Sequence, residues 1–245
     1  MFNIPSIKSS TTHRWLNVEQ SGGQENTEKR TLRLKFRKER ENHKRNCELS
    51  DLPWGANHIS RLMDFLNQHF GGLSSPSRPW PMPWTAYFPI GSELNLLGHC
   101  PMDHCWLPCD QPNGELLWFP WSIEIGSWRR DSKTLPRPPA EIPLKRFNPS
   151  LDGPWIVITP CLAADLNGIR LGYGGGYYDR FLSEHKENIF SVACLPSSFL
   201  LAAGHLPKES FDEAVDCLVT EDSVLLLAPE KFNRIKAQLL KRERG

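Results

Sequence analysis

A run of four glycines within the five positions 172–176 is the part of this 245-residue chain best suited to chemistry. Glycine adopts positive φ angles and lets backbone N–H groups approach a ligand without interference from a Cβ atom. The YYDRFL sequence that follows has helical spacing, so the glycines lead into a helix N-terminus, where the helix dipole favours phosphate. The order matches neither GxxxxGK[ST] nor GxGxxG. Spacing alone therefore leaves two interpretations open, a phosphate-binding loop and a glycine-rich turn before a surface helix.

The elements that must position this loop are clearest in the second half of the chain. Residues 155–158 (WIVI) form an apolar run between two prolines, which indicates a fully buried strand. Residues 189–194 and 217–219 predict two further buried strands, and a helix is expected to begin near Pro229. Strands that alternate with helical segments indicate a mostly parallel sheet covered on both faces, hence an α/β fold.

The first half predicts two helices and less regular structure. Residues 1–27 are polar and read as a flexible tail, and residues 28–245 as a single catalytic domain. Residues 29–45 carry nine Lys and Arg against two Glu, which predicts a helix that is mostly exposed on its basic side. Residues 56–70 predict an amphipathic helix, and residues 84–88 a short strand. Residues 100–150 are rich in Pro and Trp and are the least legible, with 116–119 as one expected strand.

The composition excludes several classes of protein. Lys and Arg (29) balance Asp and Glu (28), which argues against wholesale nucleic-acid binding, although a local basic patch stays possible. Apolar runs are too short to span a bilayer, and the N-terminus lacks the apolar core of a secretory signal. The seven cysteines are then expected to be reduced thiols in a cytoplasmic protein. The HCxxxHCxxxC run from His99 to Cys109 reads as an irregular loop, with a bound metal as the alternative.

Residues 158–182, ITPCLAADLNGIRLGYGGGYYDRFL, resemble the signature of the 5-formyltetrahydrofolate cyclo-ligase (methenyltetrahydrofolate synthetase) family. Three further segments match that family in the same order. They are KRTLR at 29–33, YFP followed by Glu93 at 87–93, and the Asp…Asp-x-x-x-Thr-Glu pattern between residues 212 and 221. The resemblance thus spans residues 28 to about 227, with a loose match over 100–150.

The resemblance implies a fold, a reaction and partners. The fold would be a three-layer α/β/α domain with a mostly parallel sheet, like the sugar-phosphate isomerase and CoA-transferase group. The activity would be that of an ATP- and Mg²⁺-dependent ligase of one-carbon metabolism, which converts 5-formyltetrahydrofolate to 5,10-methenyltetrahydrofolate and releases ADP and phosphate. We expect a reduced folate and ATP as small-molecule partners, a monomer, and neither a membrane nor a nucleic acid as partner.

The matched positions acquire roles through the same resemblance. Arg170 and Tyr178 would be catalytic, and Phe88, Glu93 and Tyr177 would contact the folate. Asp179 and Asp216 would hold Mg²⁺, which takes carboxylate oxygens and keeps several waters. ATP would be bound by basic residues and by the backbone of the glycine loop: Lys29, Arg30, Arg33, Arg170, Leu171, Gly172, Tyr173, Gly174, Gly175, Gly176, Tyr177 and Tyr178.

Some positions depart from the family pattern. Neutral Tyr173 and Gly175 stand where many members carry a basic residue, so the positive charge must come from Lys29, Arg33 and Arg170. Asn95 and Phe211 also replace residues common in the family. Two alternatives therefore stay open: a paralogue that uses ATP on another small substrate, and a non-catalytic nucleotide- or RNA-binding regulator. The second would rely on the basic helix, which has few aromatic residues for stacking on bases.

Overall fold

The computed structural model describes residues 27–49, 55–70, 82–97, 99, 105–121, 138 and 141–243. Residues 1–26 of the expected tail (1–27) lie outside these ranges, and so does much of 100–150. The two predicted helices are present as α1 (Thr27–Leu49) and α2 (Ala56–Phe70). The described helices are all too short or too polar to cross a membrane.

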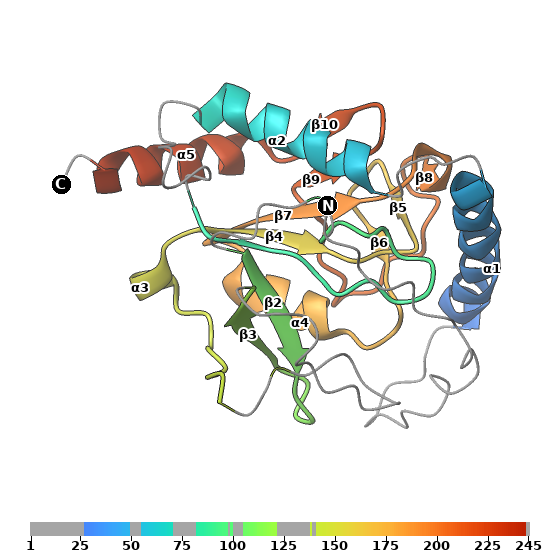
Figure 1. Ribbon diagram of the computed structural model, residues 1–245, viewed down its shortest axis with the longest axis horizontal. Coiled ribbons are helices and arrows are strands. Elements are labelled where there is room, and N and C mark those ends of the chain that lie inside the picture. Colours follow the sequence, from blue (N-terminus) through green and yellow to red (C-terminus); the bar gives the residue numbers. More distant parts are fainter. Residues whose placement is uncertain are drawn as a thin grey trace.

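A seven-stranded sheet forms the centre of the molecule, in the order β10-β9-β7-β4-β1-β2-β3 (Figure 1). Its inner strands run parallel: β1 (Trp84–Thr85), β2 (Cys105–Asp110), β4 (Trp155–Thr159), β7 (Ile189–Cys194) and β9 (Cys217–Val219). The edge strands β3 (Leu116–Pro120) and β10 (Val224–Leu226) are antiparallel to their neighbours. The predicted mostly parallel sheet is confirmed, and β4, β7 and β9 lie where the apolar runs place them.

Helices cover both faces of this sheet, which completes the three layers of an α/β/α fold. On one face α2 and α5 (Pro229–Glu243) bury an apolar cluster that includes Leu62, Phe232 and Ile235. On the other face α4 (Tyr177–His185) packs its Phe181 and Leu182 against Trp155 of β4, and the short α3 (Pro149–Asp152) precedes that strand. The helices α2, α4 and α5 each turn an apolar stripe toward the sheet, as the sequence periodicity predicts.

A second, three-stranded sheet was not predicted. It consists of β6 (Arg170–Leu171), β5 (Ala163–Asp165) and β8 (Leu200–Leu201), in that order. Its strands are two or three residues long, too short to leave an alternating pattern in the sequence. The helix α1 lies beside this small sheet (Figure 1), where Phe36 is buried among side chains that include Leu162 and Leu171.

The prediction of an irregular loop at the HCxxxHCxxxC run was wrong for its second part, because Cys105–Asp110 form strand β2. The prolines obscured this strand. Pro108 is opposite Trp118, whose N–H and C=O both bond to Lys145 on the far side of β3. The Pro108 nitrogen thus points away from β3, toward β1, which ends before it reaches this level. A proline is tolerated inside a sheet where no N–H is needed.

Candidate functional site

The glycine loop connects β6 to the N-terminus of α4, as its sequence predicts. Gly174 and Gly176 have φ angles of 106° and 63°, and Gly176 is the residue that caps the helix. These left-handed conformations strain any residue with a Cβ atom. A Cβ atom added to Gly172 would meet nothing within 4 Å. At Gly172 the loop therefore presents bare backbone next to open space, as a phosphate-binding loop needs, whereas Cβ atoms at Gly175 and Gly176 would meet Tyr177 and Arg180.

Arginine side chains on the inner face of α1, the face turned toward the protein, bind the backbone of this loop. The Arg33 Nε donates a hydrogen bond to the carbonyl oxygen of Gly172 at 3.0 Å, and Arg37 donates to that of Tyr173 at 3.1 Å. The Arg37 guanidinium also lies over the Tyr173 ring, 5.2 Å from its centroid. Four basic residues of this helix are exposed, Arg30, Lys35, Lys38 and Arg45, but the expectation that its basic side is mostly exposed was wrong for Arg33 and Arg37. Carbonyl oxygens of the loop replace water as partners of these cations.

Lys29 is the most enclosed of the predicted phosphate ligands on α1, with 4% of its surface exposed. Its ammonium contacts Glu209 Oε2 at 2.5 Å and also donates to Asp212. Arg30, predicted for the same role, lies on the exposed side of the helix. Of these two neighbouring basic residues, Lys29 therefore points toward the candidate site and Arg30 toward the solvent.

Arg170 and Asp179, predicted separately as a phosphate ligand and a metal ligand, form an ion pair of 3.1 Å. The guanidinium of Arg170 also donates to the carbonyl oxygen of Glu213 at 2.9 Å, and the Glu213 N–H donates to Asp179 Oδ1 at 3.3 Å. Arg170 is buried, while about a quarter of the Asp179 side chain remains exposed. The pairing holds the cation and the carboxylate together next to the start of α4.

Asp216 has different surroundings. Its Oδ2 accepts hydrogen bonds from the N–H and the hydroxyl of Ser191, both at 2.7 Å. The Lys231 ammonium, from α5, lies 2.9 Å from Oδ1 and 2.7 Å from Oδ2. Within the described ranges, no three His, Cys, Asp or Glu side chains gather in a way that could hold a metal ion. The structure therefore pairs each predicted magnesium ligand with a cation, and the metal role of both stays a prediction.

Glu93 lies in the loop that follows β1, with 4% of its surface exposed. Its Oε2 accepts a hydrogen bond from the Ile90 N–H at 2.7 Å, which closes a turn. Burial raises the pKa of Glu93 to about 8, an effect that the Ile90 N–H and the charges of Arg40 and Arg37 partly offset. A carboxyl group with such a pKa holds its proton near neutral pH, so it can donate as well as accept a hydrogen bond.

Two neighbouring tyrosines at the start of α4 face different parts of the site. The buried Tyr178 hydroxyl has no hydrogen-bond partner within the described residues. Its pKa is raised first by burial and then by Glu93, while Arg170 opposes the shift, so both groups are near Tyr178. Tyr177 instead lines a cavity of about 310 Å³ beside the β2–β3 turn, with its ring 5.1 Å from the Arg180 guanidinium. Phe88, the other predicted folate contact, packs against the core beneath α2.

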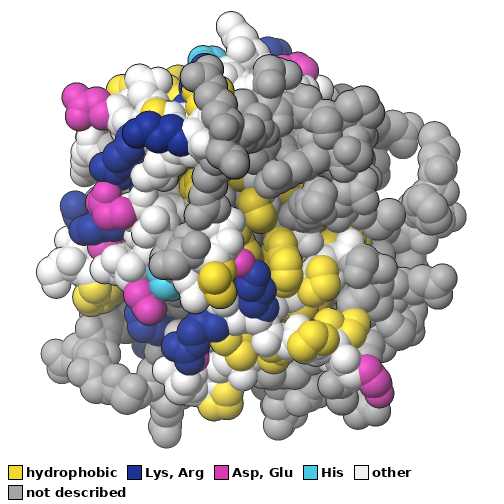
Figure 2. Space-filling view, turned by 90° about the vertical axis from the view of Figure 1, so that its left-hand side faces the viewer, with side chains coloured by type: hydrophobic (Ala, Val, Ile, Leu, Met, Phe, Trp, Pro, Cys, Tyr) yellow, Lys and Arg dark blue, Asp and Glu magenta, His cyan; other side chains and the backbone are white. Residues whose placement is uncertain are grey.

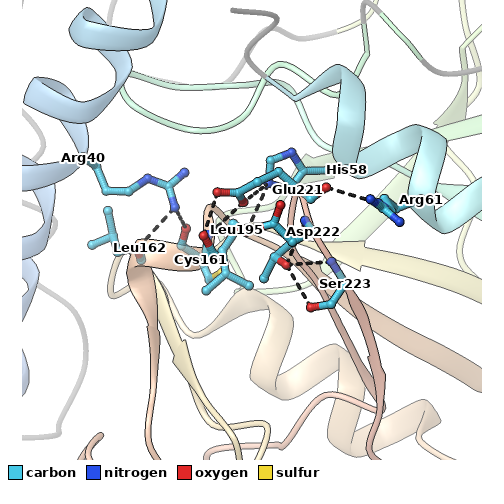
Figure 3. A network of polar contacts seen from close by, with 11 residues as sticks. Arg40, His58, Arg61, Cys161, Leu162, Leu195, Glu221, Asp222 and Ser223 are labelled. Atoms are coloured by element: carbon cyan, nitrogen blue, oxygen red, sulfur yellow. Dashed lines mark hydrogen bonds and ion pairs between the residues drawn. The ribbon is translucent and has the colours of Figure 1, made fainter.

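Sequence reasoning missed Arg40, which is even more completely buried than Arg170. It is 1% exposed and donates to the carbonyl oxygens of Ser92, Cys161 and Leu162. Figure 3 shows Arg40 reaching from α1 toward Cys161 and Leu162. The same view shows the contact between His58 of α2 and Glu221, which follows β9. Arg40 thus connects α1 to the loop that carries Glu93. A signal was present, because Lys29, Arg33, Phe36 and Arg40 follow the 4-3-4 spacing of one helix face.

Comparison with known proteins was made by sequence and by structure. The model of the 5-formyltetrahydrofolate cyclo-ligase family matches residues 103–221. The mitochondrial 5-formyltetrahydrofolate cyclo-ligase of Arabidopsis thaliana is 37% identical over 82 residues, which are 30% of this chain and 30% of that protein. A probable 5-formyltetrahydrofolate cyclo-ligase of Schizosaccharomyces pombe is 32% identical over 79 residues, 29% of this chain and 39% of that protein. The matched segment therefore spans less than half the length of either relative.

Two solved structures share the fold. The methenyltetrahydrofolate synthetase of Aquifex aeolicus has a TM-score of 0.54 and 24% identity, and the match covers 80% of this chain and 93% of that one. The synthetase of Mycoplasma pneumoniae has a TM-score of 0.53 and 18% identity, with 79% and 98% covered. At this identity the structures establish the architecture alone. Together with the sequence matches, they confirm the predicted resemblance to the family.

Proposed function

We propose that this chain, which resembles the 5-formyltetrahydrofolate cyclo-ligase family in sequence and in fold, is itself an ATP-dependent ligase of that kind. It would convert 5-formyltetrahydrofolate to 5,10-methenyltetrahydrofolate and release ADP and phosphate. The observation that carries the proposal is the meeting of three groups at one place. The glycine loop leads into Tyr178, the Arg170–Asp179 pair includes the next residue of the chain, and the buried Glu93 is close enough to raise the pKa of Tyr178.

The nucleotide side of the site is formed by the glycine loop and by the cations around it. Backbone N–H groups at the start of α4 would receive the phosphates, since a helix N-terminus favours negative charge. Arg170 precedes the loop in the chain, and Arg33 of α1 bonds to the loop at Gly172. Both would neutralise the phosphoryl oxygens. This supply of positive charge replaces the basic residue that many members of the family carry inside the loop.

The folate side is formed by Glu93 and Tyr178. A buried carboxyl group with a pKa near 8 can pair with the ring nitrogens and amino group of a pteridine, which offers both donors and acceptors. The Tyr178 hydroxyl, buried and without a partner within the described residues, would hydrogen-bond to the substrate between the two halves of the site. A buried polar group of this kind becomes satisfied when its ligand binds.

Asp179 fits a magnesium ion better than Asp216 does. Mg²⁺ is commonly held by one or two carboxylates together with substrate phosphates and water. The Asp179 contacts with Arg170 and Glu213 both fall on Oδ1, and its side chain is partly exposed toward solvent. Both oxygens of Asp216 already accept hydrogen bonds, and its side chain is 9% exposed. We therefore propose Asp179 as the protein's ligand, where the ion would supply charge neutralisation for the phosphates.

The proposed reaction transfers the γ-phosphoryl group of ATP to the formyl oxygen of the folate, with ADP as the leaving group. N10 then attacks the activated carbon and loses its proton, the five-membered ring closes, and the formyl oxygen departs with the phosphate. This chemistry depends on positioning and on charge stabilisation, which Arg170 and the loop backbone would provide, more than on a protein nucleophile. Burial of Glu93 and Tyr178 would keep water away from the phosphorylated intermediate.

The regulator alternative has weaker support. The side of α1 that carries Lys29, Arg33 and Arg40 faces the protein, so these cations do not form an exposed surface for RNA. The exposed basic residues of α1 are interspersed with Glu28, Glu39 and Glu41. On the opposite side of the molecule, shown in Figure 2, the described Lys and Arg side chains are likewise interspersed with acidic and apolar ones. Binding of nucleic acid without sequence preference uses a continuous positive groove with aromatic side chains.

The decisive experiment mixes the purified protein with 5-formyltetrahydrofolate and Mg-ATP and follows the methenyl chromophore together with ADP. We expect one ADP for each methenyl group formed, and no product when ATP is replaced by a non-hydrolysable analogue. If the protein binds Mg-ATP but forms no chromophore, the cyclo-ligase proposal fails and a paralogue acting on another substrate takes its place. If it binds neither ATP nor folate, the proposal fails altogether.

A further inference from the structure

Five consecutive residues, Glu209–Glu213, touch three of the groups proposed to bind ATP and magnesium. These groups come from three different elements: Lys29 from α1, Arg170 from β6 and Asp179 from α4. Sequence analysis assigned no role to these five residues. Their common position suggests one shared task, because loops that meet several functional side chains commonly orient them.

The contact with Lys29 is the most specific of the three. A lysine side chain is a flexible stem of four carbons, so its ammonium has a defined position only when partners hold it. Here Glu209 and Asp212 each accept a hydrogen bond from the ammonium, and the Phe211 ring lies 5.6 Å from it. An ammonium group has three N–H bonds. Within the described residues two of them go to carboxylates, which leaves one direction for an incoming anion.

The segment is itself held as a closed turn. Asp212 Oδ2 accepts a hydrogen bond from the Glu209 N–H at 2.6 Å, and the Asp212 N–H donates to the Glu209 carbonyl oxygen at 3.1 Å. The same Asp212 oxygen therefore bonds both to its own turn and to Lys29. Glu213 continues the turn and bonds through its backbone to Arg170 and Asp179. One rigid turn thus fixes two cations and one carboxylate relative to each other.

We infer that the turn Glu209–Glu213 is a positioning element for nucleotide phosphates, in which Asp212, assisted by Glu209, holds the Lys29 ammonium where it meets the triphosphate. The inference rests on the proposed function, since it concerns how that site binds ATP. Asp212 acts through Lys29 and is a positioning residue that does not itself touch the nucleotide. Its effect must therefore depend on the presence of Lys29.

A double-mutant cycle tests this dependence. The four proteins are the wild type, Asp212→Asn, Lys29→Met and the double variant, with Asp64→Asn on the exposed side of α2 as the matched control. For each protein, calorimetry gives the Kd for Mg-ATP without folate, and steady-state turnover gives the KM values for ATP and folate. We expect Asp212→Asn to raise the Kd and KM for ATP about tenfold, the KM for folate to stay within about twofold, and Asp64→Asn to match the wild type.

In the Lys29→Met background, we expect Asp212→Asn to change the ATP affinity by less than about twofold. An equal loss in both backgrounds would mean that Asp212 acts on structure alone, and it would overturn the inference. Tighter ATP binding by Asp212→Asn would also overturn it, because the carboxylate would then compete with the phosphates for Lys29.

Glu209→Gln provides a second variant in case Asp212→Asn does not fold, since the Glu209 side chain is 25% exposed. We expect it to weaken ATP binding about threefold, with the same dependence on Lys29; an unchanged Kd would contradict the inference. The binding data also separate this inference from the proposed function. A wild type that binds Mg-ATP but forms no methenyl product contradicts the function, and the cycle still decides the inference. A wild type that does not bind Mg-ATP contradicts both.

Discussion

The helices α1 and α5 both pack one face against the rest of the protein, but with opposite chemistry. The inner face of α5 consists of Phe232, Ile235 and Leu239, all buried in the apolar cluster above the sheet. The inner face of α1 presents Lys29, Arg33 and Arg40, which bond to carboxylates and to carbonyl oxygens of loops. Apolar packing stabilises the fold wherever it occurs. Buried cations are costly unless paired, and the paired cations on α1 support the proposed role of this helix in binding phosphate.

The largest effect is expected from the apolar side of this comparison. Ile235→Ala should lower the free energy of unfolding by about 2 to 5 kcal/mol, because it removes a fully buried side chain and leaves a cavity. Urea titration measures the loss, and Gln238→Ala on the exposed side of α5 is the control. Turnover per folded molecule should not change. A matching loss of turnover would mean that α5 also shapes the site.

Asp179→Asn should have the largest effect on the polar side. If Asp179 holds the magnesium ion and orients Arg170, the variant loses charge stabilisation that matters most in the transition state. We expect turnover to fall on the order of 10²–10³-fold. Urea unfolding should change less than turnover, because Arg170 keeps its hydrogen bond to the Glu213 carbonyl oxygen and Asn retains one side-chain oxygen as an acceptor. Partial recovery of turnover at high Mg²⁺ concentration would identify metal affinity as the lost property, whereas unfolding that parallels the lost turnover would contradict the assignment.

Asp216 is a predicted magnesium ligand whose partner, Lys231, belongs to the helix α5 and thus to the apolar side of the comparison. Asp216→Asn should destabilise the protein by about 2 to 3 kcal/mol, since it leaves a largely buried ammonium without its counter-charge. We expect turnover per folded molecule to be retained. A fall in turnover as large as that of Asp179→Asn would instead support the role of Asp216 as a magnesium ligand. The two measurements together decide whether this carboxylate serves the fold or the reaction.

Glu93 should make the free energy of unfolding decrease as pH rises, which is the opposite of the effect of a carboxylate whose pKa is lowered by folding. Its pKa is about 8 in the folded protein against 4.5 as the ordinary value, so between these limits the folded state binds more protons than the unfolded state. Stability should therefore fall as pH rises through this window, by at most roughly 1.4 kcal/mol per pH unit. Glu93→Gln should flatten the curve when urea unfolding is compared at about pH 5 and pH 8. Curves of the same slope for the wild type and Glu93→Gln would show that Glu93 is ionised in the folded protein.

The smallest effect is expected for Arg33. Arg33→Ala should weaken Mg-ATP binding about tenfold and leave adenosine binding unchanged, because the guanidinium lies at the glycine loop where phosphates are proposed. Lys38→Ala on the exposed side of α1 is the matched control for calorimetry. Equal losses for ATP and adenosine would indicate that Arg33 acts by packing α1 against the loop.

The regular elements could be predicted because their periodicity is local. The buried strand at 155–159 and the stripe of Phe232, Ile235 and Leu239 are visible in the order of the residues alone. The small sheet could not be predicted, because two- and three-residue strands carry no period, and β2 was hidden by Pro108. The site was predicted through the family resemblance, which pointed to Arg170, Glu93 and Asp179. Arg40 and Glu209 were missed, and Asp212 was matched to the family pattern without a role, because their partners are distant in the sequence.

The polar inner face of α1 also has a consequence for how the chain folds. Lys29 and its carboxylate partner Asp212 are 183 residues apart, and Arg33 is 139 residues from Gly172. A helix with so few apolar side chains cannot dock early by hydrophobic collapse, and contacts across such separations form slowly. During synthesis α1 is made first and waits for the C-terminal half before it finds its partners. We therefore expect the proposed phosphate site to be completed late, when α1 joins the loops of the C-terminal half.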